Sequence, residues 1–123
     1  NNRGLVLTLA LSYSSRIEII GAAKKLCEDA RKGSLRPEEV TEERFERELD
    51  TAGMPDPDLL IRTSGEMRVS NFLLWQISYA EIYVSNKYWP DFRKADFLEA
   101  IQDYQRRERR FGRAQTNAAG ETR

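Results

Sequence analysis

Arginine and hydroxyl side chains are concentrated on one short stretch of this sequence, between Arg62 and Ser70. The guanidinium groups of Arg62 and Arg68 can each hold two phosphate oxygens, because their N–H donors form a fixed planar fork. Ser70 adds a hydroxyl group, and Gly65 gives the loop flexibility. This pattern indicates a site for a phosphate or a diphosphate. The alternative is that the arginines pair with neighbouring carboxylates and that Ser70 only caps a helix.

Apolar segments on both sides of this stretch should position it. Residues 58–61 are predicted to form a short buried strand, and the arginines follow its carboxyl end, where open α/β sheets bind their ligands. Residues 71–79 are apolar nearly all round and are predicted to form a buried helix. The N–H groups at the start of that helix would add roughly half a positive charge to the site.

Further strands and helices are predicted on both sides of this region. Residues 5–11 are almost continuously apolar, which is typical of a strand buried on both faces of a parallel sheet, and residues 82–84 form another strand. A short helix is expected at residues 42–49. Two longer helices should each bury an apolar stripe. The first ends at Gly33, and its inner residues are Ile17, Ile20, Ala23, Ala30 and Leu26 or Cys27. The second spans residues 95–110, and its inner residues are Phe97, Leu98, Ile101 and Tyr104.

The alternation of strands and helices predicts the α/β fold class. Three buried strands would leave both edges of a parallel sheet open, and natural proteins avoid such edges. We therefore predict the C-terminal portion of a parallel-sheet α/β domain with helices on both faces. Residues 1–113 belong to this domain, and residues 114–123 form a small, polar, disordered tail.

Composition narrows the function classes. The 123 residues include 20 basic and 20 acidic side chains, so no net charge attracts nucleic acid. The basic run at residues 106–113 is short and has no interleaved aromatic platform, which also argues against nucleic acid. One cysteine and no histidine exclude an internal disulfide and a Cys/His metal site, and suit a reducing cytoplasm. The longest apolar stretch, residues 5–11, is too short to span a bilayer.

Several motifs in order resemble the cis-prenyltransferase family, in particular the undecaprenyl diphosphate synthases. The main match is Asp-Leu-Leu-Ile-Arg-Thr-Ser-Gly-Glu-Met-Arg-Val-Ser-Asn-Phe, from Asp58 to Phe72, and it continues to Glu81. The resemblance extends through Trp89-Pro-Asp-Phe to residues 106–112. Residues 4–16 are similar to a strand and turn of the same family.

The resemblance implies a transferase that condenses isopentenyl diphosphate with an allylic diphosphate, such as farnesyl diphosphate. The product would be a cis-polyprenyl diphosphate such as undecaprenyl diphosphate, made in the cytoplasm or at the membrane periphery and delivered to the membrane. Positions that bind the isopentenyl diphosphate in the family correspond here to Arg62, Arg68, Val69 and Ser70. No catalytic residue is expected within this span.

The resemblance also implies a metal ion and a homodimer. Glu81 would take part in binding Mg²⁺, while the residues alone leave open a salt bridge from Glu81 to a nearby arginine. Arg110 and Gly112 would reach the substrate site of the partner subunit. The alternative for them is a basic last turn and an ordinary helix stop. The apolar residues 71–79 are expected at the dimer interface.

One family motif is absent from these residues. In the family, a histidine-led strand followed by Met-Asp-Gly-Asn-Gly-Arg-Trp carries the aspartate for Mg²⁺ and catalysis and the loop for the allylic diphosphate. The sequence therefore predicts the isopentenyl diphosphate half-site without turnover by the chain alone. The alternative is a non-catalytic partner subunit of a prenyltransferase complex.

Overall fold

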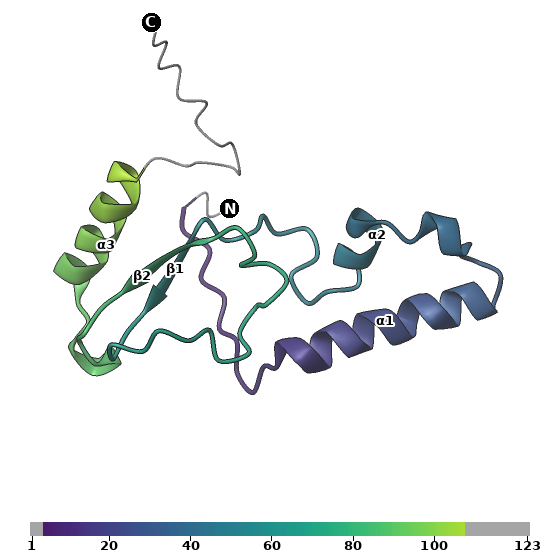
Figure 1. The fold of residues 1–123 in the computed structure, drawn as a ribbon, viewed down its shortest axis with the longest axis horizontal. Coiled ribbons are helices and arrows are strands. Elements are labelled where there is room, and N and C mark those ends of the chain that lie inside the picture. Colours follow the sequence, from purple (N-terminus) through teal and green to yellow (C-terminus); the bar gives the residue numbers. More distant parts are fainter. Residues whose placement is uncertain (1–3, 108–123) are drawn as a thin grey trace, which may run out of the picture.

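The computed structural model describes residues 4–107. Figure 1 shows α1 extending away from the strands and α3 lying beside them. The elements are α1 (Ser15–Arg31), α2 (Glu42–Glu46), β1 (Leu59–Arg62), β2 (Glu81–Val84) and α3 (Lys94–Arg106), with single 3₁₀ turns at Pro37–Glu39 and Trp89–Asp91. The tail predicted at residues 114–123 and the end of the predicted helix at 95–110 lie outside the described residues.

The two strands form a parallel pair, and α3 packs against β2. Leu59 lies opposite Glu81, and Arg62 lies opposite Val84. The strands predicted at 58–61 and 82–84 are confirmed, each displaced by one residue at its boundary. The α/β class with a parallel sheet is also confirmed.

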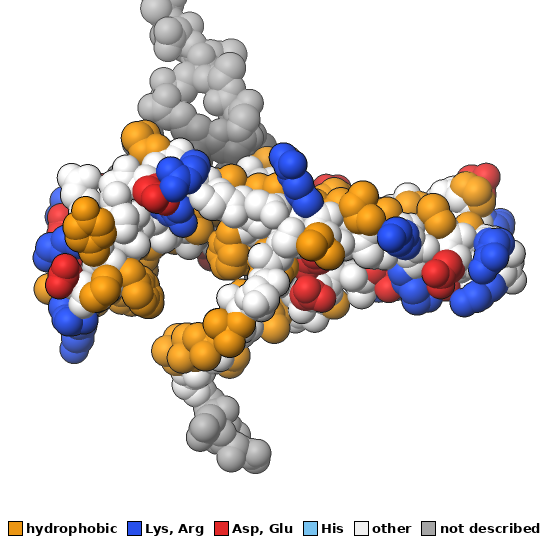
Figure 2. Space-filling view, turned by 90° about the horizontal axis from the view of Figure 1, so that it is seen from below, with side chains coloured by type: hydrophobic (Ala, Val, Ile, Leu, Met, Phe, Trp, Pro, Cys, Tyr) orange, Lys and Arg blue, Asp and Glu red, His pale blue; other side chains and the backbone are white. Residues whose placement is uncertain are grey.

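The third strand, predicted at residues 5–11, is wrong. In the described part of the chain the sheet contains only β1 and β2. Leu5, Val6 and Leu11 are between 82% and 93% exposed. Figure 2 shows a projecting arm that carries hydrophobic side chains clear of the body of the molecule. An apolar run specifies that a segment favours burial, but a strand also needs a neighbour whose backbone can pair with it.

Helix α1 forms where the sequence predicts it but buries a different face. Its buried residues are Ser15, Glu18, Ala22 and Leu26, spaced three or four apart. Of the predicted apolar stripe, Leu26 is buried as expected, but the inward orientation predicted for Ile17 and Ile20 is wrong, because they are 74% and 56% exposed. The reason is that polar partners on other segments satisfy the hydroxyl of Ser15 and the carboxylate of Glu18. The helix ends before Gly33, whose φ of 73° favours glycine.

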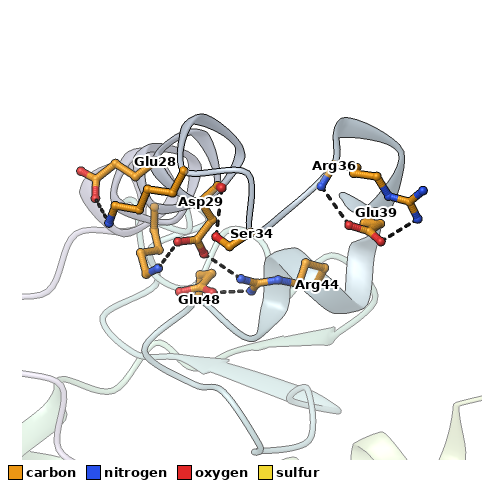
Figure 3. Close-up of polar contacts among 9 residues, drawn as sticks. Glu28, Asp29, Ser34, Arg36, Glu39, Arg44 and Glu48 are labelled. Carbon is orange, nitrogen blue, oxygen red and sulfur yellow. Dashed lines mark hydrogen bonds and ion pairs between the residues drawn. The ribbon is translucent and has the colours of Figure 1, made fainter.

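An ion pair joins α1 to α2. Asp29 of α1 lies 3.1 Å from Arg44 Nη2 (Figure 3) and also pairs with Lys25 of the same helix, at 2.5 Å from Nζ. Arg44 also pairs with Glu48. The hydrogen bond from Lys25 holds the pKa of Asp29 below its usual value. Thr41 caps α2 by accepting a hydrogen bond from the Arg44 backbone N–H, as the sequence suggests.

Helix α3 begins with a cap formed by Asp96. The Asp96 carboxylate accepts from the Arg93 backbone N–H at 2.8 Å and from Lys87 Nζ at 2.5 Å. Asp96 and Ala100 are buried, whereas Phe97 and Leu98 are nearly half exposed. The inward orientation predicted for those two residues is wrong, because the buried face of α3 carries Asp96, held by Lys87 and Arg93, and Ala100 instead.

The helix predicted at residues 71–79 is also wrong, and the segment folds as a series of turns. Ser70, Asn71 and Leu73 have φ values of 48°, 60° and 45°, which interrupt a right-handed helix. Trp75 still packs on Phe45, with ring centroids 4.5 Å apart. The burial predicted for this segment is found only in part, since Tyr79 is 90% exposed, and the predicted backbone conformation is wrong. No described helix combines the length and apolar character needed to cross a membrane.

Candidate functional site

The arginine loop, residues 62–70, runs from the carboxyl end of β1 toward the amino end of α1 (Figure 1). Its first turn is fixed to the chain that follows β2. The Ser64 N–H donates to the Lys87 carbonyl, and the Gly65 N–H donates to the Ser85 carbonyl, both at 2.8 Å. Gly65 has a φ of 66°, and a Cβ there would lie 3.1 Å from Asn86 Oδ1. A side chain at Gly65 would therefore disturb this turn.

Three of the predicted diphosphate-binding residues meet in this loop. Arg62 Nη2 donates to Ser70 Oγ at 3.2 Å and also pairs with Glu66. Arg68 Nη2 lies 2.6 Å from Glu66 Oε1. The Glu66 carboxylate therefore bridges the two guanidinium groups. Val69 is half-buried, and its carbonyl accepts from the Phe72 N–H at 3.1 Å.

Sequence reasoning foresaw pairing of the arginines with carboxylates but did not single out Glu66. The signal was present, because Glu66 lies between the arginines in the sequence. The predicted helix at 71–79 does not form, so it supplies no N-terminal partial charge to the loop. The positive charge of the site comes from side chains instead.

The loop carries more positive than negative charge. Two guanidinium groups face one carboxylate, which leaves one positive charge in excess. The Arg62 Nε atom is buried and has no hydrogen-bond partner in the described part of the chain. A buried donor without an acceptor is unfavourable, so an incoming anion that reached it would bind more tightly. The Arg68 side chain is 68% exposed and can turn toward such an anion.

Glu81 does not lie with the arginine loop. It begins β2, three residues before the position opposite Arg62, which is about 10 Å along a strand. Its Oε2 atom is 2.9 Å from Arg107 Nη1. This is the salt bridge that the sequence left open as the alternative. The role of Glu81 in binding Mg²⁺ stays a prediction.

The Arg107 side chain contacts residues of both α3 and β2. Besides Glu81 it contacts Asp103, at 2.9 Å from Nε and 2.5 Å from Nη2, and it donates to the Ile82 carbonyl at 3.0 Å. Hydrogen bonds to Glu81 and Asp103 raise the pKa of Arg107. Among residues 4–107 no group of three or more His, Cys, Asp or Glu side chains is arranged to hold a metal ion. Arg110 and Gly112 lie outside the described residues, and their roles stay predictions.

A family model described as putative undecaprenyl diphosphate synthase matches residues 1–112. The chain belongs to this family. The resemblance seen in the sequence is thereby confirmed over nearly the whole chain, and the matched residues include the arginine loop.

Curated members of the undecaprenyl diphosphate synthase family are similar to the chain over part of their length. An isoprenyl transferase of Geobacillus kaustophilus is 55% identical over 111 residues, which cover 90% of this chain and 43% of the relative. A tritrans,polycis-undecaprenyl-diphosphate synthase (geranylgeranyl-diphosphate specific) of Thermoplasma acidophilum is 55% identical over 107 residues, covering 87% of this chain and 42% of the relative. The chain thus spans less than half the length of these proteins.

A solved structure is similar in fold as well. Lavandulyl diphosphate synthase from Lavandula x intermedia, in complex with dimethylallyl diphosphate, has a TM-score of 0.80 and 44% sequence identity. The match covers 84% of this chain and 44% of that protein. The arrangement of helices around a parallel strand pair is therefore shared with a prenyl diphosphate synthase.

Proposed function

We propose that this chain carries the isopentenyl diphosphate-binding half-site of a cis-prenyltransferase. The observation that carries the proposal is the convergence of Arg62, Arg68 and Ser70 at the carboxyl end of β1, with one positive charge in excess. Guanidinium and hydroxyl donors suit the oxygens of a diphosphate. Ligands of open α/β sheets bind at this end of the strands.

The whole protein would condense isopentenyl diphosphate with an allylic diphosphate to give a cis-polyprenyl diphosphate, such as undecaprenyl diphosphate. A carbon–carbon bond forms as the alkene attacks the allylic carbon, the allylic carbon–oxygen bond breaks, pyrophosphate leaves and a proton is removed. Arg62, Arg68 and Ser70 would contribute position, because a held diphosphate directs the alkene toward the allylic carbon. Farnesyl diphosphate is the proposed allylic substrate.

The metal proposed with this function is Mg²⁺. Glu81 fits it as one ligand, because Mg²⁺ takes one or two carboxylates together with phosphate oxygens and water. Arg107 already occupies one oxygen of Glu81, so the ion would compete with that salt bridge. When bound, Mg²⁺ would neutralise negative charge on a diphosphate. Glu81 and the arginine loop are far enough apart that their roles can be tested separately.

Isothermal titration calorimetry of the protein with isopentenyl diphosphate tests the half-site. Arg68→Ala should weaken binding by about tenfold, since a charge-assisted hydrogen bond is lost. Arg68→Lys should also bind less tightly, because an ammonium group lacks the two-point fork. Arg36→Ala is the matched control: it removes another exposed arginine paired with a glutamate, on a different element.

Two results would contradict the proposal. One is equal binding of isopentenyl diphosphate by the wild-type protein and Arg68→Ala. The other, measured in the whole protein with its allylic site, is an equal loss of affinity for isopentenyl and farnesyl diphosphates, because the loop is proposed to serve only the first of them.

We further propose a homodimer whose polyprenyl product passes to the membrane, working in the cytoplasm or at the membrane periphery. Support for association comes from exposed apolar side chains, among them Tyr79 at 90% exposure and Met67 at 89%. Sedimentation equilibrium at micromolar concentration should give twice the mass of 14.3 kDa. Tyr79→Asp should shift the mass toward the monomer, because a charge would be felt twice in a two-fold interface. A monomer with native helix content would exclude this association.

A further inference from the structure

Asn71 immediately follows the arginine loop and contacts the start of α1. The Ser15 N–H donates to the Asn71 carbonyl at 3.1 Å, and the Arg16 N–H donates to Asn71 Oδ1 at 3.0 Å. Asn71 Nδ2 in turn donates to Ser14 Oγ at 2.8 Å. Asn71 therefore forms hydrogen bonds with three consecutive residues, 14–16, through its backbone carbonyl and both polar atoms of its side chain.

These contacts have a simple physical cause. The first N–H groups of a helix have no partner within the helix, and they are unfavourable when left without one. Ser14, the N-cap of α1, reaches only the Ile17 N–H, at 3.5 Å. Asn71 supplies the acceptors for the two preceding N–H groups. It therefore acts as a second cap, contributed by a residue 55 positions away from Arg16.

The backbone at the end of the loop depends on these contacts. Ser70 and Asn71 both have positive φ values, of 48° and 60°. This conformation is unfavourable for residues other than glycine, although asparagine tolerates it better than most. External hydrogen bonds are therefore needed to hold the two residues in place. The Leu74 N–H strengthens the anchor by donating to the fully buried Ser15 Oγ at 2.9 Å.

The consequence for the loop follows from the covalent chain. Ser70 Oγ meets Arg62 Nη2 at 3.2 Å, and Ser70 is joined directly to Asn71. Because Asn71 is fixed to α1, the position of the Ser70 hydroxyl relative to Arg62 is fixed as well. We infer that Asn71 is a positioning residue for the diphosphate-binding loop, acting through Ser70 rather than by contact with the ligand. The inference rests on the proposed function of that loop.

Titration calorimetry of the protein with inorganic pyrophosphate tests the inference. Asn71→Gly removes both side-chain hydrogen bonds, while glycine accepts the positive φ without strain. It should weaken pyrophosphate binding by about fivefold, because at most the one hydrogen bond from the Ser70 hydroxyl to the ligand is lost. Asn71→Asp keeps the acceptor for the Arg16 N–H and should recover part of the affinity. Ser14→Ala removes the partner of Nδ2 together with the cap on the Ile17 N–H, and it should have a smaller effect in the same direction.

A double-mutant cycle separates positioning from a general loss of structure. If Asn71 acts through Ser70, then Asn71→Gly should have little further effect on affinity in a Ser70→Ala background. Thr41→Ala is the matched control, because it removes an equivalent cap from α2. It should lower the melting temperature without changing pyrophosphate affinity.

Three results would overturn the inference: unchanged affinity in Asn71→Gly, effects of Asn71→Gly and Ser70→Ala that simply add, or an equal loss of affinity in Thr41→Ala. Failure of the proposed function looks different. In that case the wild-type protein would not bind pyrophosphate, or Arg62→Ala and Arg68→Ala would bind it as well as wild type. Loss in those arginine variants with normal binding by Asn71→Gly would refute only the role of Asn71.

Discussion

The two ends of the β1–β2 pair use the same chemical groups in opposite proportions. At the carboxyl end of β1, Arg62 and Arg68 share the single carboxylate of Glu66. At the amino end of β2, Glu81 and Asp103 share the single guanidinium of Arg107. One end therefore has a positive charge in excess, and the other end has a negative charge in excess. The first suits an anion, and the second suits a cation.

The two ends also differ in how firmly they are held. Arg107 joins β2 to α3. Its guanidinium group donates to the carboxylates of Glu81 and Asp103 and to the backbone carbonyl of Ile82. In the loop, Arg68 is 68% exposed and contacts only its near neighbour Glu66 among the ion pairs of the described residues. An arginine that stabilises the fold and an arginine available to a ligand can thus be distinguished by their contacts, although both pair with carboxylates.

The largest effect should follow removal of both loop arginines. Arg62→Ala combined with Arg68→Ala should weaken isopentenyl diphosphate binding by about 100-fold, because two charge-assisted contacts are lost. Titration calorimetry measures this change. Arg107→Ala is the internal control and should leave the affinity unchanged. An equal loss of isopentenyl diphosphate affinity in the double variant and in Arg107→Ala would show that the two ends of the β1–β2 pair do not differ in ligand binding.

The second largest effect should be a loss of thermal stability when Arg107, at the amino end of β2, is replaced. Arg107→Ala should lower the melting temperature by about 4 °C, because a tie between α3 and β2 is lost while solvent screens part of the ion pairing. Differential scanning calorimetry provides the measurement. Arg68→Ala should melt within about 1 °C of wild type, since exposed ion pairs contribute little. If Arg68→Ala lowered the melting temperature more than Arg107→Ala, then Arg68, and not Arg107, would be the arginine that stabilises the fold.

Glu81→Gln should have a smaller effect on stability. Arg107 keeps Asp103 and the Ile82 carbonyl, so the melting temperature should fall by only about 2 °C. If Glu81 also binds Mg²⁺, the variant should need a higher Mg²⁺ concentration for half-maximal enhancement of isopentenyl diphosphate binding. Asp103→Asn serves as the comparison. An unchanged Mg²⁺ dependence would leave Glu81 with only its structural salt bridge.

The smallest effect should appear in acid. The hydrogen bond from Lys87 holds the pKa of Asp96 below its usual value, so the folded state favours the ionised carboxylate. This contribution is present above the unfolded pKa, near pH 4, and is lost as the pH falls through the lower folded value.

Asp96→Asn should therefore show a shallower loss of stability below about pH 4 than wild type, measured by urea unfolding at a series of pH values. Asp91→Asn is a suitable control at a nearby exposed carboxylate. Parallel acid curves for Asp96→Asn and wild type would show that the Lys87 pair contributes nothing to the difference.

Local sequence features predicted much of this protein. Short apolar runs located β1 and β2, and helical patterns located α1, α2 and α3 approximately. The residues Arg62, Arg68 and Ser70 indicated the candidate site, and several ordered motifs carried the resemblance to the family. These features act over a few residues, through helix caps, strand burial and turn chemistry. For this reason they can be read without knowledge of distant contacts.

Tertiary structure decided the rest. The run at residues 5–11 has strand composition but no partner strand in the described structure, and the apolar residues 71–79 fold as turns. The Asn71 side chain meets Ser14 across 57 positions and Arg16 across 55. A hydrogen bond of that kind depends on where two remote segments come together, and no local pattern encodes it. The sequence by itself thus determined which groups make up the proposed diphosphate site, and only the folded chain decided what holds them in place.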